Sequence, residues 1–376
     1  DLKAEECASL VTLIKNPNRR SPLNNPGINR DGRNYVLMRM NDEGMISDDE
    51  YEEAVDKPLG LNPKPLRRGT SHLYERVADA VGAALGEDAL SSGGFTVHTT
   101  ILAEAQNAAY AALRESLLRA ESRPGYAHEK HDPQRKLTEK PANFLQGAVL
   151  MVDHGTGEVL AHVGGRDYAQ VPYDFIELGK RPLGTAFFPF IYAAGFENGM
   201  TPVSMTEDEP MDNRSVMVGG REGILGEWGM ELASPVYEGR ITLRRAFEQS
   251  KIAATVRLTD RIGLKRMVDK AVDFGFPFGK SELLPRLGVG FEEASLKQAA
   301  RAISAFPRGG TLPSESLAYI DRVENPKGQT IYRRPRQAAG VPRAVIDPAT
   351  AWQVHSMMAG SLYRGSSKGV LDGLAE

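Results

Sequence analysis

Disulfide bonds, membrane-spanning segments and clustered positive charge are all missing from this 376-residue sequence. Cys7 is the only cysteine, so the chain cannot form an internal disulfide bond. No apolar run approaches the ~20 residues that a membrane-spanning helix requires. The 46 Lys and Arg residues are balanced by 49 Asp and Glu, for a net charge of -3, and no segment collects basic residues on one side. We therefore expect no nucleic-acid partner, because such proteins carry a basic surface.

The composition itself is typical of a soluble globular protein. Hydrophobic residues make up 41% of the chain and charged residues 25%, which indicates folded domains and not general disorder. A length of 376 residues allows two or three domains. Shifts in composition along the chain suggest boundaries after residues 60 and 146.

Residues 1–60 are expected to form short helices. An approximate apolar stripe runs through residues 4–14, and a second helix is expected around residues 35–40. A third helix should begin near Asp48, where a run of acidic residues favours the positive end of a helix dipole. The sequence thus predicts a small helical region at this end of the chain.

Residues 61–146 are predicted to mix helices with a strand. A helix is expected over residues 72–85, a strand of β-branched residues over 95–100, and a long helix over 102–122. The polar, proline-bounded stretch 123–141 is expected to be an exposed, mobile loop.

That loop contains the cluster His128-Glu129-Lys130-His131-Asp132, whose side chains are potential metal ligands. Two histidines without a third ligand at helical or hairpin spacing do not complete a coordination shell, so we expect these residues to be solvated. No metal ion and no cofactor are predicted for this chain.

The clearest local structure in the sequence is a hairpin that begins at Gly147. Apolar strands at residues 148–152 and 158–163 flank the turn Asp-His-Gly-Thr-Gly. Helices flanking a sheet that this hairpin starts would give residues 147–376 an α+β fold. The later expected elements are helices at 242–249, 253–262, 264–274, 293–306 and 347–363, and a second hairpin at 319–332.

The most informative stretch is residues 181–192, which read Arg-Pro-Leu-Gly-Thr-Ala-Phe-Phe-Pro-Phe-Ile-Tyr. Pro182 and Gly184 interrupt the preceding segment, and apolar residues then recur at helical spacing. A helix is therefore expected to start near Thr185, which would place Thr185 at the helix N-terminus.

This stretch resembles the nucleophile-bearing helix of class A penicillin-binding proteins, the bifunctional peptidoglycan synthases. In that family the turn reads roughly Pro-Gly-Ser-x-Phe-Lys-Pro and contains a Ser-x-x-Lys motif. The strings Gly-Ala-Val-Leu-Met-Val-Asp and Val-Gly-Gly-Arg-Asp-Tyr within residues 147–168 resemble the start of the family's transpeptidase domain. Residues 93–100 resemble its interdomain linker, and strings within residues 1–60 resemble the last part of a family 51 glycosyltransferase domain.

The resemblance implies a domain organisation. Residues 1–60 would be the C-terminal tail of the glycosyltransferase domain, and residues 61–146 the linker. Residues 147–376 would be a transpeptidase-like domain of the penicillin-binding-protein and β-lactamase type, truncated at its C-terminus. The family's catalytic glutamates lie upstream of any string matched here, so no glycan polymerisation is expected from this chain by itself.

The residues that the family uses for acyl transfer are replaced in this sequence. Thr185 stands at the position of the nucleophilic Ser, and Phe188 stands at that of the Lys. The family's Ser-x-Asn motif maps to Ser250-Lys251-Ile252, where Ile252 replaces the Asn. A phenyl ring cannot accept a proton, and losing a general base costs on the order of 10²- to 10⁴-fold in rate. Neither Ser-x-x-Lys nor Ser-x-Asn occurs anywhere in the 376 residues, and no Lys-Thr-Gly strand motif is present.

The resemblance therefore implies part of a peptidoglycan synthase whose transpeptidase domain is inactive and acts as a scaffold or docking surface. Two alternatives stay open: a weakly active DD-transpeptidase or carboxypeptidase that uses Thr185, and a non-enzymatic module that binds peptidoglycan or a cell-division protein. A substitute pair of Ser250 and Lys251 is not expected, because adjacent residues do not face each other on a helix.

The resemblance also implies partners and a location. The expected partners are peptidoglycan stem peptides or proteins of cell-wall synthesis. The expected location is the periplasmic face of the bacterial inner membrane, with attachment only through an N-terminal anchor helix that this chain lacks.

Overall fold

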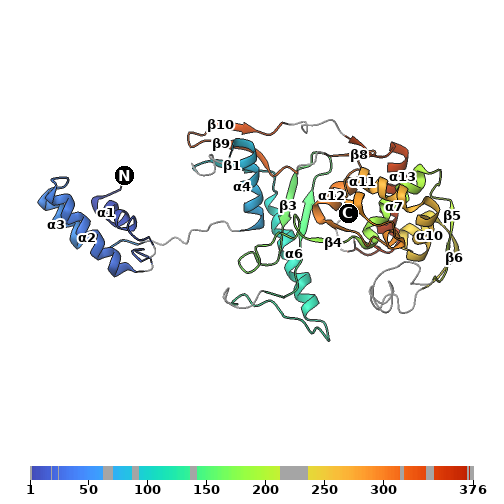
Figure 1. Cartoon of the computed structure of the whole chain (residues 1–376), viewed down its shortest axis with the longest axis horizontal. Helices are drawn as coiled ribbons and strands as arrows, with labels where there is room; N and C mark the ends of the chain where they lie inside the picture. Colours follow the sequence, from blue (N-terminus) through green and yellow to red (C-terminus); the bar gives the residue numbers. More distant parts are fainter. Residues whose placement is uncertain are drawn as a thin grey trace. The chain divides into compact units, whose positions relative to one another are not determined.

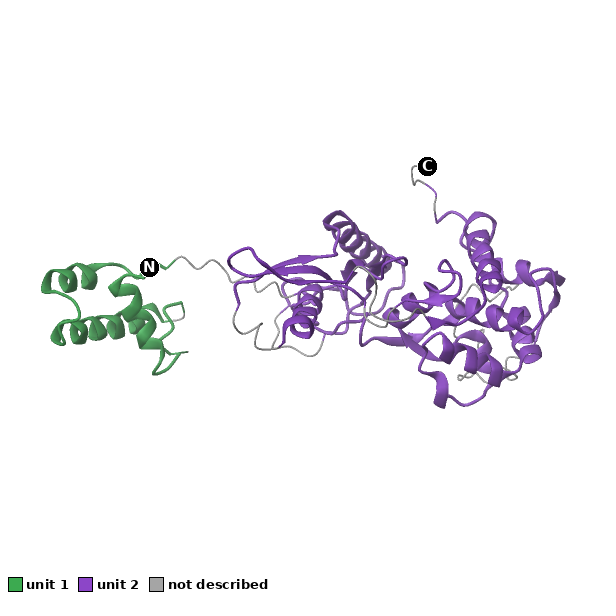
Figure 2. Cartoon of the chain, turned by 90° about the horizontal axis from the view of Figure 1, so that it is seen from above, with its two compact units in different colours: residues 1–69 green, residues 70–376 purple. Residues whose placement is uncertain are grey.

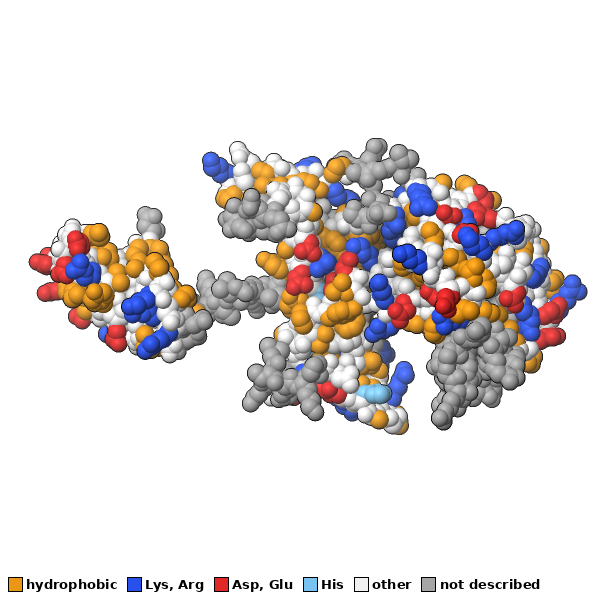
Figure 3. Space-filling model, in the orientation of Figure 1, with side chains coloured by type: hydrophobic (Ala, Val, Ile, Leu, Met, Phe, Trp, Pro, Cys, Tyr) orange, Lys and Arg blue, Asp and Glu red, His pale blue; other side chains and the backbone are white. Residues whose placement is uncertain are grey.

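The computed structural model describes residues 2–17, 19–23, 25–61, 71–86, 93–135, 142–211, 236–313, 317–335, 343–370 and 372. The chain divides into two compact units, residues 1–69 (unit 1) and residues 70–376 (unit 2) (Figure 1, Figure 2). Of the described helices, none is both long and apolar enough to cross a membrane. On the face seen in Figure 3, acidic and basic side chains are interspersed over unit 2.

The described residues of unit 1 form three helices, as the sequence predicts. They are α1 (Ala4–Leu13), α2 (Pro26–Asp42) and α3 (Asp48–Asp56). The second helix starts well before residue 35, because Pro26 in its first turn has a backbone angle that suits a helix start and needs no N–H partner there. Arg33 is buried, and its guanidinium donates hydrogen bonds to the carbonyl oxygens of Val55 and Lys57 at the end of α3.

Unit 2 begins with the helix α4 (His72–Leu85), the strand β1 (Thr96–Thr99) and the long helix α6 (Ala103–Glu121), all close to the predicted ranges. The strand β1 pairs with β9 (Ile320–Glu324), which also pairs with β10 (Thr330–Arg333) in the predicted second hairpin. The sheet therefore joins the linker region to a segment near the C-terminus (Figure 1).

A threonine hydroxyl stabilises this junction between the linker region and the C-terminal segment. Thr100 follows β1, and its Oγ1 lies 2.8 Å from the carbonyl oxygens of both Val159 and Ala318. Three segments that are distant in sequence thus meet at one side chain.

The predicted hairpin at Gly147 is confirmed as β2 (Val149–Val152) paired with β3 (Val159–Val163). The single sheet expected to grow from it is not found in the described part of the chain. The described strands form one three-stranded and four two-stranded sheets. The local sequence did not predict this arrangement, because the pairing of most strands depends on contacts between distant segments. The α+β class is confirmed. The remaining strands are β4 (Lys180–Pro182), β5 (Met205–Asp208), β6 (Gly239–Thr242), β7 (Glu293–Ser295), β8 (Thr311–Leu312) and β11 (Arg343–Ala344).

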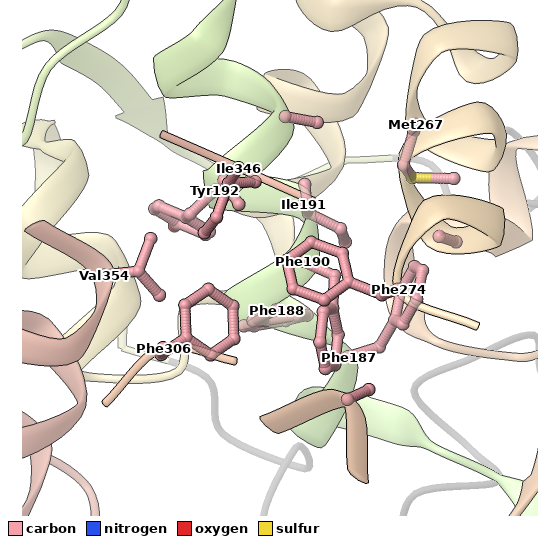
Figure 4. Close-up of a cluster of buried hydrophobic side chains, with 14 of the residues drawn as sticks. Phe187, Phe188, Phe190, Ile191, Tyr192, Met267, Phe274, Phe306, Ile346 and Val354 are labelled. Carbon is pink, nitrogen blue, oxygen red and sulfur yellow. The ribbon is translucent and has the colours of Figure 1, made fainter. Parts of the chain in front are cut away.

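The largest core of unit 2 surrounds the helix α7 (Phe188–Glu197), in which every residue from Phe188 to Phe196 is buried (Figure 4). Side-chain caps fix the starts of three neighbouring helices at Thr242, Ser295 and Asp347. The surrounding helices are α9 (Leu243–Glu248), α10 (Ile252–Ile262), α11 (Leu264–Asp273), α12 (Leu296–Ile303) and α13 (Pro348–Arg364).

The polar loop after α6 is mostly exposed over its described residues 123–135. The expectation that both of its histidines are solvated is wrong for His131. Its Nε2 lies 3.0 Å from a carboxylate oxygen of Asp167, and its ring packs edge-on against Phe144. Residues 136–141 of the predicted mobile loop, like residues 62–70 of the predicted linker, lie outside the described residues.

Candidate functional site

Thr185 lies in a single 3₁₀ turn, η1 (Gly184–Phe187), and the α-helix begins only at Phe188. This differs from the expectation of a helix starting near Thr185. A residue distant in sequence stabilises this turn, because Gly184 N donates a hydrogen bond to the carbonyl oxygen of Gly290 at 2.9 Å. A side chain at Gly290 would place its Cβ 2.1 Å from the carbonyl oxygen of Gly184. The side chain of Thr185 is exposed, and its hydroxyl has no hydrogen bond with any described residue.

Phe188 occupies the position that carries the Lys in the motif, and only 2% of it is exposed. Its ring lies 6.5 Å from that of Tyr192 within the apolar cluster of Figure 4. Burial raises the pKa of the Tyr192 hydroxyl, which lies 3.1 Å from Oγ1 of Thr255 on α10. Tyr192, whose ring lies next to that of Phe188, is therefore neutral at pH 7.

Ser250 lies in the turn between α9 and α10, not on a helix. Its φ of 52° is positive, which is unique among the described residues other than glycine. Such a backbone costs on the order of 1–3 kcal/mol and is typical of positions that the surrounding structure constrains. The Ser250 hydroxyl lies 2.8 Å from that of Ser366.

Lys251, the next residue, pairs with two carboxylates. Its Nζ lies 2.9 Å from Asp208 and 3.1 Å from Glu238, and it donates to the carbonyl oxygen of Val236 at 2.6 Å. Burial by itself would lower the pKa of Lys251, but hydrogen bonds to both carboxylates outweigh this and raise it. Lys251 is therefore a charged ammonium group at neutral pH.

The four motif positions lie around one core. Phe188 belongs to the large apolar cluster, and Ile252, the first residue of α10, packs against the same cluster. Thr185 and Ser250 lie on the turns that lead into α7 and α10, and these two helices contact each other. Among the described residues, no group of three or more His, Cys, Asp or Glu could hold a metal ion.

Two features of this region were not predicted from the sequence. One is the hydroxyl pair of Tyr192 and Thr255, and the other is the ion-pair cluster of Lys251 with Asp208 and Glu238. Linear spacing gives no signal for either, because each joins elements that are far apart in the chain.

Comparison with known proteins places this fold in a family. The model of the penicillin binding protein transpeptidase domain matches residues 147–372. Penicillin-binding protein 1A of Pseudomonas aeruginosa is 24% identical over 93% of this chain and 52% of its own length. Penicillin-binding protein 2D of Bacillus subtilis is 25% identical, over 96% of this chain and 48% of its own length. The chain spans about half the length of these curated relatives.

A solved structure supports the same fold. The 2.6 Å crystal structure of penicillin-binding protein 1A from Haemophilus influenzae matches with a TM-score of 0.77 and 19% identity, over 100% of this chain and 71% of that one. The expected fold is thereby confirmed. Because the family match covers more than half of the 376 residues, the chain belongs to the family of the penicillin-binding protein transpeptidase domain.

Proposed function

We propose that this chain is part of a class A peptidoglycan synthase in which the transpeptidase domain no longer catalyses acyl transfer. The domain instead serves as a scaffold or docking surface for cell-wall synthesis. The observation that carries this proposal is the burial of Phe188, because an apolar ring fills the position of the lysine that would take the proton of the nucleophile.

Acyl transfer needs an activated hydroxyl, a group that takes its proton, and fixed donors for the developing oxyanion. The motif positions retain hydroxyls at Thr185 and Ser250 but no lysine, and the β-methyl group of Thr185 restricts the rotamers available for attack. Lys251 does not replace the missing base, because two carboxylates hold it in its charged form. The loss of a general base corresponds to a rate decrease on the order of 10²- to 10⁴-fold.

The proposal extends to the rest of the protein. A Neisseria meningitidis penicillin-binding protein 1A matches 98% of this chain, a share that includes most of unit 1. This supports the interpretation of α1 to α3 as the tail of a family 51 glycosyltransferase domain. The complete protein would then polymerise glycan strands at the periplasmic face of the inner membrane, with stem peptides or cell-wall synthesis proteins as partners of unit 2.

A fluorescent penicillin tests the loss of acyl transfer. We expect no covalent adduct after incubation with the folded protein under conditions that label an active penicillin-binding protein stoichiometrically. The variant Thr185→Ala should likewise form no covalent adduct. A stoichiometric adduct on Thr185 that this variant abolishes would overturn the proposal in favour of a weakly active enzyme. Release of D-Ala from a stem-peptide mimic gives a second, independent measurement of the same activity.

A further inference from the structure

A cavity of about 590 Å³ lies in unit 2, between residues of the predicted linker and residues 162–169. None of its lining residues belongs to the transpeptidase motif positions. Its walls are one face of α6, the first turn of α4, the segment from the end of β3 to Ala169, and His131 with Pro133. Figure 1 shows α4, β3 and α6 next to one another. This volume is in the range of small-molecule sites, about 300–1,000 Å³.

His72 lines this cavity and carries a buried polar atom. The residue is 4% exposed, and its Nε2 has no hydrogen-bond partner among the described residues. Its ring lies against a pair of glycines, since a Cβ added at Gly165 would come within 2.9 Å of Cε1 and 3.3 Å of Nε2. Tyr168 packs edge-on against the same ring. Leaving such a group unpaired destabilises the folded state, and a ligand that pairs with it would remove this cost.

The chemistry of this nitrogen is set by its surroundings. Burial lowers the pKa of His72, so its imidazole is neutral at pH 7. The backbone of Val171 and Tyr173 acts in the opposite direction on this pKa, but burial is the larger effect. In a neutral imidazole one nitrogen donates and the other accepts, so Nε2 of His72 can accept a hydrogen bond when the ring proton is on Nδ1.

The charges on the cavity wall leave one cation uncompensated. Arg166 forms a bidentate pair with the carboxylate of Glu121, and Asp167 is paired with His131. Arg114 is an exposed residue on the cavity-lining face of α6 and has no ion pair with any described residue. A guanidinium is well suited to bind a carboxylate in a bidentate manner.

An aromatic surface accompanies these two groups. Tyr110 lies one helical turn before Arg114 on the cavity-lining face of α6, and it is 49% exposed. Tyr110 and Tyr168 thus add aromatic surface to a cavity that is also lined by Arg114 and His72.

We propose that this cavity binds an N-acylated α-amino acid with a free carboxylate, as found at the C-terminus of a peptide. Arg114 pairs with the carboxylate, and Nε2 of His72 accepts a hydrogen bond from the amide N–H. An apolar side chain of the ligand lies against Tyr110 and Tyr168. The site is independent of the proposed loss of acyl transfer, because it uses none of the motif residues.

Isothermal titration of the intact chain with three related probes tests each contact. N-acetylphenylalanine carries both the carboxylate and the N–H, and should bind saturably. Its amide lacks the charge, and its N-methyl derivative lacks the donor, so each should bind at least about tenfold more weakly, as loss of about 1.4 kcal/mol implies. No saturable binding of the acid, or equal binding of the acid and the amide, would overturn the proposal.

Matched variants locate the binding in this cavity. Arg114→Gln should weaken binding of the acid by at least about tenfold. Arg119→Gln, on the same helix but outside the cavity lining, should leave binding unchanged. His72→Phe should remove the preference for the N–H probe over its N-methyl derivative. If that variant fails to fold by circular dichroism, the N-methyl probe with the unaltered chain still decides the role of His72. Binding that Arg114→Gln leaves intact refutes the site.

A tripeptide, Ala-Ala-Phe, separates the two sources of this ligand chemistry. Tighter binding than N-acetylphenylalanine indicates a peptide C-terminus, because further residues then add contacts. Equal binding indicates a small N-acyl amino acid.

Discussion

The substitution Phe188→Ala tests whether Phe188 stabilises the folded state as a core residue. Phe188 is 2% exposed and belongs to the apolar cluster around α7, so its ring stabilises the folded state. Truncation of a buried Phe to Ala costs about 3–5 kcal/mol. The expected loss for Phe188→Ala is in this range.

The magnitude has two sources. Removing the ring forfeits the transfer free energy of a buried aromatic side chain, about 1.5–3 kcal/mol. The remainder comes from the cavity, which the surrounding buried side chains, such as Ile191 and Tyr192, fill only in part. With an m-value of about 3 kcal/mol per M of urea, the midpoint of unfolding should fall by about 1 M or more.

Urea unfolding followed by far-UV circular dichroism measures this loss. Thr185→Ala is the matched control, because this exposed side chain in the adjacent turn should change stability by less than about 0.5 kcal/mol. A loss below about 1 kcal/mol for Phe188→Ala would show that the ring does not stabilise the fold, and would refute the inference drawn from its burial.

Two further predictions concern backbone fit and pH. Gly290→Ala should lower the melting temperature far more than Gly199→Ala. Both glycines have positive φ, but only at Gly290 would the new Cβ collide with Gly184, whereas Gly199 faces open space; equal decreases would contradict this. The hydrogen bond from Arg166 lowers the pKa of Glu121, so the stability from this pair is present at neutral pH and is lost as pH falls below the ordinary Glu value through the folded-state pKa. The unaltered chain should therefore be more stable than the Arg166→Gln variant at pH 7, and this difference in unfolding free energy, measured by denaturant unfolding, should shrink towards pH 3. A difference that does not change with pH would contradict a stabilising role for the Arg166–Glu121 pair.

Elements with local signals were predictable from the sequence. The hairpin at Gly147 follows from alternating apolar residues around a glycine-containing turn, and the helix beginning at Pro348 follows from the capping residue Asp347. In each case the residues that decide the structure lie within a few positions of one another.

Elements set by distant contacts were not predictable. The 3₁₀ turn at Thr185 depends on the approach of Gly290 to Gly184, and the left-handed backbone of Ser250 depends on how α9 meets α10. The resemblance to a known family supplied the four motif positions, but it could not supply the partners of Lys251. The catalytic assignment of those positions stays a prediction.

The junction at Thr100 has a consequence for synthesis of the protein. Thr100 and Ala318 are separated by 218 residues, which a ribosome adds in roughly 11–44 s at about 5–20 residues per second. During that interval β1 is translated but its partner β9 is not, so the edge of β1 is open to pairing with other chains. Nascent chains that stop before residue 320 should therefore be especially dependent on chaperones.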